Sequence, residues 1–243
     1  MRLLACGAAL SVALDLEGGW IIEETTNYAV GEKSHSRITI DSQRYKQQTK
    51  GETLIIDLKQ ETVYFVRDSD KSYFGGRIDE VAAELRKNAM SEMNEEDNIF
   101  GAAGAVEEDK TILIKKLKER FVASGFSGEK YLILANGEPK KELFIAPKLT
   151  AYNEIDPKKL NEIMLWLSGS FATSDQTRIE LSDEYIGLIK QGYPIKTIER
   201  DPGGGLIQTA VVKAEQKSVA SEEFALPKGY AKTNSEEFYR PLE

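Results

Sequence analysis

The stretch that decides the fold runs from Thr53 to Phe74 and reads TLIIDLKQETVYFVRDSDKSYF. Its first part, TLIIDL, places Leu54, Ile56 and Leu58 on one face of an extended chain, because successive side chains of a strand point to opposite faces. The next part, TVYFVRD, is rich in β-branched and aromatic residues, and the short polar connections KQET and DSDK separate these runs. The pattern predicts half-buried antiparallel strands joined by hairpins.

The same period of two continues toward the N-terminus. WIIEETTNYAV (20–30) and SRITIDSQRYKQQ (36–48) each alternate between apolar and polar residues, and GEKS and TKGE provide short connections. We therefore expect four strands between Gly19 and Phe74. Trp20 and Ile22 share a face in the first, and Ile38 and Ile40 share one in the second.

After Phe74 the period becomes helical. Apolar residues recur every three or four positions in RIDEVAAELRKNAMSEMNEED (77–97), which is typical of an amphipathic helix. Three strands are expected next (111–123, 130–135 and 142–146), followed by two helices that begin at Asp156-Pro157 and at Ser182, and by a hairpin around PGGG (202–205). This order predicts an α+β fold in which one antiparallel sheet curves and the helices cover one of its faces.

The N-terminal segment MRLLACGAALSVAL combines Arg2, a short apolar run and a small-x-small site at 11–13. This predicts a signal peptide over residues 1–13 and a periplasmic or secreted protein, because the run is too short for a transmembrane helix. A core strand or helix is the alternative for this segment. LLAC also resembles a lipobox, which would make the protein a lipoprotein anchored to the membrane through Cys6. We expect a single domain over residues 14–232 and a mobile tail over 233–243.

Composition and residue types favour a protein without catalytic machinery. The net charge of −8 argues against nucleic-acid binding, although Lys115, Lys116, Lys118 and Arg120 form a basic run. Cys6 is the only cysteine and His35, in a polar turn, is the only histidine, so disulfides, Cys or His metal sites and a Ser-His-Asp triad are not expected.

Acidic and glycine-rich motifs carry no chemistry that we can identify. Glu23 and Glu24 point to opposite faces of a strand and cannot act as a pair. MSEMNEEDN lacks the pattern of a calcium loop, and GAAGAVEED follows a helix and lacks the Lys-Ser/Thr of a phosphate-binding loop. We expect no enzyme activity, metal or cofactor. A hydrolase that uses carboxylates alone is a rival for which the sequence offers no suitable pair.

The apolar faces of the strands allow two interpretations. They fill a core, or they line an apolar cleft between sheet and helices that binds a lipid or another hydrophobic ligand. Periodicity does not distinguish the two, and for Trp166, in the second helix, core packing is favoured. The candidate ligand-binding residues are Trp20, Ile22, Tyr28, Ile38, Ile40, Leu54, Ile56 and Tyr64.

Several stretches together carry a family resemblance: GGWIIEETT (18–26), SRITIDSQRY (36–45), the 53–74 stretch, FSGEKYLILANGEPKKELFIAP (126–147), QGYPIKTIE (191–199) and EEFALPKGYAK (222–232). They resemble the uncharacterised bacterial extracytoplasmic domain grouped with the LolA/LolB-like lipoprotein carriers. The resemblance implies a half-barrel, which is a strongly curved antiparallel sheet with helices on its concave face. It also implies a cavity for acyl chains and no catalytic residues. The helix at 78–97 and the GAAGAVEED connection depart from the family and would alter or fill that cavity.

These observations predict an exported binding protein of the cell envelope that holds a lipid, an acyl chain or another hydrophobic small molecule. A lipidated protein is a further possible partner. The alternative is a structural or protein-interaction module with a filled core. EEFALPKGYAK is expected to close the sheet, because Pro227 restricts the chain before it and Gly229 allows a tight turn.

Overall fold

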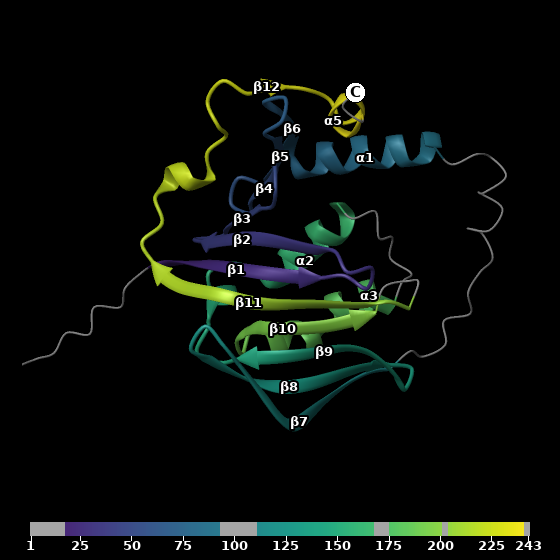
Figure 1. The fold of residues 1–243 in the computed structure, drawn as a ribbon. Coiled ribbons are helices and arrows are strands. Elements are labelled where there is room, and N and C mark those ends of the chain that lie inside the picture. Colours follow the sequence, from purple (N-terminus) through teal and green to yellow (C-terminus); the bar gives the residue numbers. More distant parts are fainter. Residues whose placement is uncertain (1–17, 93–110, 168–174, 201–203, 241–243) are drawn as a thin grey trace, which may run out of the picture.

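The computed structural model describes residues 18–92, 111–167, 175–200 and 204–240, and Figure 1 shows their arrangement. The predicted signal peptide, Cys6 and the GAAGAVEED connection lie outside the described residues. The first half of the chain forms a meander of six strands: β1 (Gly19–Asn27), β2 (Lys33–Asp41), β3 (Arg44–Gln48), β4 (Glu52–Asp57), β5 (Thr62–Arg67) and β6 (Ser72–Arg77).

The amphipathic helix α1 (Ile78–Glu92) follows β6 directly. The second meander contains β7 (Ile112–Ala123), β8 (Phe126–Ala135) and β9 (Glu138–Ala146). A 3₁₀ turn, η2 (Ala151–Asn153), then leads to α2 (Pro157–Leu167), α3 (Asp175–Leu181) and α4 (Asp183–Ile189). The chain continues through β10 (Tyr193–Arg200), β11 (Leu206–Lys217), the 3₁₀ turn η3 (Ser221–Phe224), β12 (Ala231–Lys232) and α5 (Ser235–Tyr239).

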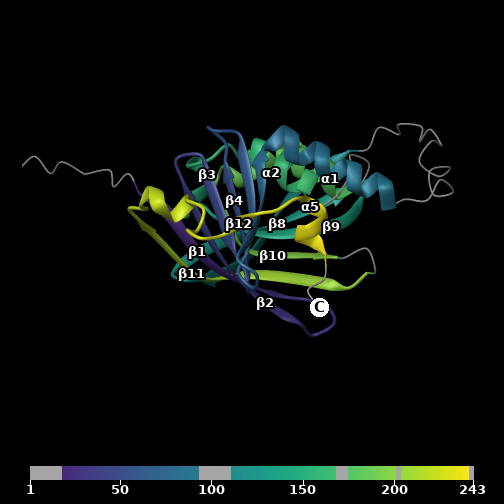
Figure 2. The same ribbon diagram turned by 90° about the horizontal axis from the view of Figure 1, so that it is seen from above.

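The twelve strands of the described residues form one curved sheet in the order β12-β6-β5-β4-β3-β2-β1-β11-β10-β9-β8-β7. The strands pair antiparallel except β12, which lies parallel to β6. The pairing of β1 with β11 joins the two meanders at the centre of the sheet. Figure 2 shows α1 and α2 together on one side of the sheet. The predicted α+β fold, a curved antiparallel sheet covered by helices, is therefore confirmed.

The main core lies between the sheet and α2. Ile22, Ile40 and Ile56 are fully buried on the sheet, and Leu160 and Ile163 of α2 belong to the same cluster. These positions share one face of their strands because the side-chain period is two. Full burial of each side chain of this size contributes about 1.5–3 kcal/mol, so the cluster is the main source of stability.

Three features of the fold differ from the sequence prediction. The stretch 36–48 is two strands, because Ser42 and Gln43 adopt positive φ angles of 50° and 71° and form a two-residue hairpin turn. Such a turn is usually signalled by Asn-Gly or Asp-Gly, which explains why Ser-Gln was not recognised. The prediction of four strands was also short by β6, and α3 was not predicted.

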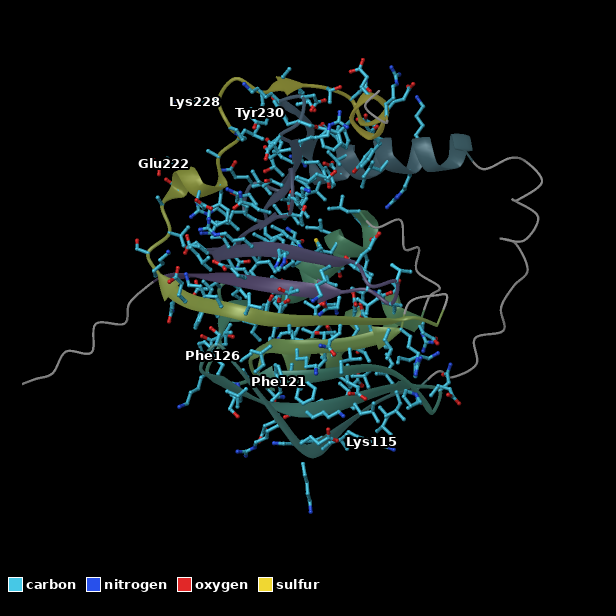
Figure 3. The ribbon with its side chains drawn as sticks, viewed as in Figure 1. Lys115, Phe121, Phe126, Glu222, Lys228 and Tyr230 are labelled. Atoms are coloured by element: carbon cyan, nitrogen blue, oxygen red, sulfur yellow. The ribbon has the colours of Figure 1, made fainter. Side chains whose placement is uncertain are left out.

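The C-terminal residues 218–240 form a strap that runs over the outer face of the sheet, along β6, and back to the core (Figure 3). Lys46 Nζ donates a hydrogen bond to the backbone oxygen of Glu223 at 2.8 Å, and Tyr230 OH donates to Asp68 Oδ1 at 2.9 Å. β12 then closes the β6 edge, as expected for EEFALPKGYAK. The expected tail at 233–243 instead contains α5, whose Phe238 is only 4% exposed. It is buried because its ring contacts the rings of Phe65 and Phe74.

None of the helices in the described part of the chain is both long enough and apolar enough to cross a membrane.

Candidate ligand cleft between α1 and α2

A cleft of about 240 Å³ lies where the end of β6 and the start of α1 meet α2. Its apolar surface comes from Ile78, Ile163 and Trp166, and its rim from charged residues. Ile163 is buried in the main core and Ile78 packs against it. The cleft therefore opens directly onto the core of the protein.

The start of α2 fixes one wall of this cleft. Asp156 caps the helix, because its Oδ1 accepts hydrogen bonds from the backbone N–H of Lys158 at 3.0 Å and of Lys159 at 3.2 Å. Pro157 occupies the first helical position, as the sequence predicted. Ile163 and Trp166 are three positions apart and so lie on neighbouring parts of the helix surface.

Trp166 is 49% exposed, which corrects the expectation that it packs in the core. The guanidinium carbon of Arg86, on α1, lies 5.2 Å from the centre of its indole ring. This cation–π contact links the two helices and is worth about 0.5–1 kcal/mol at an exposed site. A half-exposed indole beside an apolar cleft is a ready contact surface for a ligand.

The rim of the cleft carries charges of both signs. Arg77 Nε lies 3.1 Å from Asp79 Oδ1, and Lys159 Nζ lies 3.1 Å from Glu61 Oε1. These pairs are largely exposed, so each contributes roughly 0–1 kcal/mol to stability. The rim can therefore rearrange at low cost when the cleft is filled.

The structure places the eight predicted ligand-binding residues in different environments. Five of them are buried together in the main core and line none of the clefts described here: Trp20, Ile22, Ile38, Ile40 and Ile56. Tyr28 is 41% exposed near the end of the β1–β2 hairpin. Tyr64 points away from the core face that Val63 and Phe65 share, and its ring packs edge-on against Tyr73.

Leu54 is the candidate that borders a cleft. That cleft measures about 250 Å³, and Phe65, Phe238 and Tyr239 also line it. Only two residues of the α1–α2 cleft, Ile78 and Ile163, belong to the apolar stripes of the helices. The other lining residues lie outside these stripes. The sequence signal that could have pointed to the cleft is a tryptophan beside, rather than within, the stripe of α2.

A buried carboxyl group lies on the core side of β1. Tyr193 OH donates a hydrogen bond to Glu24 Oε1 at 2.9 Å, and the Tyr193 ring stacks on Tyr152 with 5.0 Å between ring centres. Burial raises the pKa of Glu24 to about 7, and the hydrogen bond from Tyr193 offsets part of this effect. Because the pKa is raised on folding, the stabilising contribution of protonated Glu24 is present at low pH and is lost as the pH rises toward and through 7.

Replacing Glu24 with glutamine is therefore expected to stabilise the protein at pH 8 by roughly 1–3 kcal/mol and to leave its stability near pH 4 almost unchanged. Glutamine keeps an oxygen acceptor for Tyr193 and carries no charge. Urea unfolding at the two pH values measures the difference. Glu23→Gln, at the adjacent position on the opposite face, is the matched control and should show no such gain. Equal effects of Glu24→Gln at both pH values would contradict the assignment.

Metal binding would draw on the His, Asp and Glu side chains of the described residues. Within them, no group of three or more His, Asp or Glu side chains could hold a metal ion. His35 is exposed on β2, and its Nδ1 lies 3.1 Å from Thr25 Oγ1.

The described residues thus define a class of protein: an α+β protein with a curved sheet, a core covered by helices and an apolar cleft between α1 and α2. Residues 21–230 match the family described as "Domain of unknown function (DUF4412)", so the chain belongs to this family. No curated protein matches the chain.

Three solved structures are similar to this chain at low sequence identity and with TM-scores below 0.5. PNGF-II matches at 7% sequence identity and a TM-score of 0.38. The match covers 91% of this chain and 32% of PNGF-II, so this chain spans about a third of the length of PNGF-II. The MucA/MucB complex of Pseudomonas aeruginosa matches at 7% identity and a TM-score of 0.41, covering 88% of this chain and 57% of that one. The LolA superfamily protein NE2245 from Nitrosomonas europaea matches at 8% identity and a TM-score of 0.30, and the match covers 87% of this chain and 91% of NE2245.

Proposed function

We propose that this protein is a carrier-like binding module of the cell envelope that holds a lipid, an acyl chain or another hydrophobic ligand without acting on it chemically. The ligand enters through the α1–α2 cleft. The single observation that carries this proposal is the cleft itself, with half-exposed Trp166 at its mouth and buried Ile163 at its floor.

The position of the cleft supports the proposal. Each methylene group that moves from water into the cleft gains about 0.8 kcal/mol, so even a short segment of acyl chain gives useful affinity. Leu85 of α1 and Met164 and Leu167 of α2 pack on the core as partly buried residues. A small separation of the two helices would extend the cleft toward these side chains and lengthen the apolar path.

The resemblance of the sequence to LolA/LolB-like carriers points to the same class of ligand. It also suggests a place of action, since an exported carrier would work in the periplasm or outside the cell. A membrane-anchored form through Cys6 is the alternative, and a lipidated protein would offer the same acyl chemistry as a free lipid.

The second candidate function is a structural or protein-interaction module, and a specific observation favours it. The five predicted lining residues in the main core are each at most 4% exposed, so the concave face is filled where the cavity was expected. The two candidate functions differ in whether an apolar small molecule binds in the α1–α2 cleft.

A fluorescent fatty-acid displacement assay distinguishes them. The wild-type protein is expected to bind the probe at micromolar concentration and to release it to oleate. Trp166→Ala should weaken binding about tenfold, because it removes the apolar contact at the mouth, and Trp166→Phe should recover most of the affinity.

Leu206→Ala is the matched control for this assay. Leu206 is about as exposed as Trp166 but lies on β11, outside the lining of the α1–α2 cleft. Its loss should leave probe binding unchanged. Absence of binding by the wild-type protein, or equal binding by Trp166→Ala, would contradict the carrier proposal and favour the protein-interaction module.

A further inference from the structure

Strand β2 extends beyond its neighbour β3. The β2–β3 ladder covers only Arg37–Asp41, whereas β2 pairs with β1 from Lys33 onward. Residues 33–36 therefore have a described strand on one side only. Figure 2 shows the β1–β2 hairpin projecting past the shorter strands.

The ladder also fixes which backbone groups face this open edge. Tyr28 N donates a hydrogen bond to Glu32 O at 2.9 Å. Ser34 and Ser36 lie two and four residues after Glu32, so their backbone groups also bond to β1. The residues between them face the other way. Lys33 and His35 thus each present a backbone N–H and a C=O to the open edge, in line with Arg37, which faces β3.

A hollow of about 570 Å³ lies along the same edge. It is lined by residues 33–37 of β2, by Gln48 at the end of β3 and the next two residues, and by Glu23, Glu24 and Val212. A bulge in the β1–β11 pairing at Glu23/Glu24 accompanies it. The space is large enough to receive a short extended segment beside β2.

Gln48, which lines this hollow, has a hydrogen-bond acceptor that no described residue satisfies. Within the described residues, its side-chain Oε1 is buried and accepts no hydrogen bond. A buried acceptor without a donor costs about 1–3 kcal/mol. Gln48 is the last residue of β3, so a segment that continues the line of β3 begins beside it and brings backbone or side-chain donors to it.

The charge of the hollow selects the kind of segment. Lys33 and Lys50 are exposed and form no ion pair with the described residues, and Arg37 reaches Glu223 only at 4.0 Å. Lys33, Arg37 and Lys50 thus place three cationic side chains along the hollow, where Glu23 lies opposite Arg37 on β1 and Glu24 points to the core face. Lysines at an open edge also disfavour pairing with a second copy of the same edge.

We propose that the open edge of β2 at residues 33–36 binds an extended acidic peptide segment of a partner protein by strand addition. The main-chain groups of Lys33 and His35 give the pairing, and Lys33, Arg37 and Lys50 select negative charge. This surface is distinct from the α1–α2 cleft and does not depend on it.

Fluorescence anisotropy with a labelled, capped peptide of alternating Glu and Val tests the proposal at low ionic strength. Wild-type protein should bind saturably, and added salt should weaken binding. His35→Pro removes the edge-facing N–H and should weaken binding about tenfold, whereas His35→Ala keeps that N–H and should stay within about twofold. Lys33→Glu and Lys50→Glu should each weaken binding about fivefold, with Lys190→Glu, at the exposed C-cap of α4, as the control for net charge.

The same peptide with alternate backbone nitrogens methylated should not bind, because it cannot pair with the edge. Unfolding curves of His35→Pro, which should match those of wild type, exclude loss of the fold as the cause. Equal binding by His35→Pro and His35→Ala, equal binding of the methylated peptide, or no binding of the parent peptide would each overturn strand addition. Sensitivity to the lysine variants alone would assign the hollow to small anions instead.

Discussion

Replacing Phe238 with alanine is expected to lower the free energy of unfolding by about 3–4 kcal/mol. Phe238 is the anchor of the C-terminal strap. Its ring centre lies 6.3 Å from that of Phe65 and 6.4 Å from that of Phe74, and the Arg67 guanidinium lies over it at 4.8 Å. Truncation leaves a cavity at the end of the main core and releases α5, so urea unfolding should show the full loss.

Tyr239→Ala is the matched control for this prediction. Tyr239 is adjacent on the same helix but more than half exposed, so its loss should cost about 1 kcal/mol or less. A Phe238→Ala variant as stable as Tyr239→Ala would mean that residues 233–240 behave as the mobile tail that the sequence suggested.

Replacing Lys141 with alanine is expected to cost about 3 kcal/mol. Lys141 is a buried cation on β9, and its Nζ lies 2.6 Å from Glu180 of α3 and 2.9 Å from Glu199 of β10. Burial alone would lower the pKa of Lys141, but Tyr185 and these two carboxylates outweigh it and raise the pKa above its usual range. Its removal leaves two partly buried carboxylates without their partner. Thermal or urea unfolding at neutral pH measures the loss.

Lys140→Ala provides the comparison. The adjacent Lys140 pairs with Asp175 at 2.9 Å, but its side chain is 38% exposed, so its removal should cost at most about 1 kcal/mol. Similar losses for the two variants would show that the Lys141 cluster is no stronger than a surface ion pair.

The fold was predictable wherever one physical signal dominated. Alternation around Ile38 and Ile40 and the helical period from Ile78 each identify a buried face, and the structure buries or half-buries them. Asp156-Pro157 and Ser182 start helices because capping chemistry is local, and Ser182 Oγ indeed accepts a hydrogen bond from Tyr185 N at 3.2 Å.

The rest depended on contacts between distant residues. Phe238 follows the polar run TNSEE (233–237), and its burial depends on Phe65 and Phe74, which lie more than 160 residues earlier. Trp20 illustrates the limit for the site: its face was predicted correctly, but its ring packs against Phe126 at 6.0 Å and helps to fill the core. Alternation gives the face of a side chain but not what fills the space in front of it.

The site has the same dependence on tertiary packing. Ile78 and Ile163 meet at the cleft only because α1 and α2 lie on the same side of the sheet. The free edge of β2 arises because β3 ends at Gln48, opposite Arg37, whereas β2 begins at Lys33. Neither feature has a motif of its own in the sequence.

The most direct test of the proposed function is the emission of Trp166 during a titration with oleate. Trp20 and Trp166 are the two tryptophans of the chain, so Trp20→Phe leaves Trp166 as the reporter at the mouth of the cleft. An apolar ligand in the cleft should shift the emission of this half-exposed indole to shorter wavelength in a saturable way, and unlabelled oleate should do so at the concentrations that displace the fluorescent probe. Emission that stays unchanged at those concentrations would contradict ligand binding between α1 and α2.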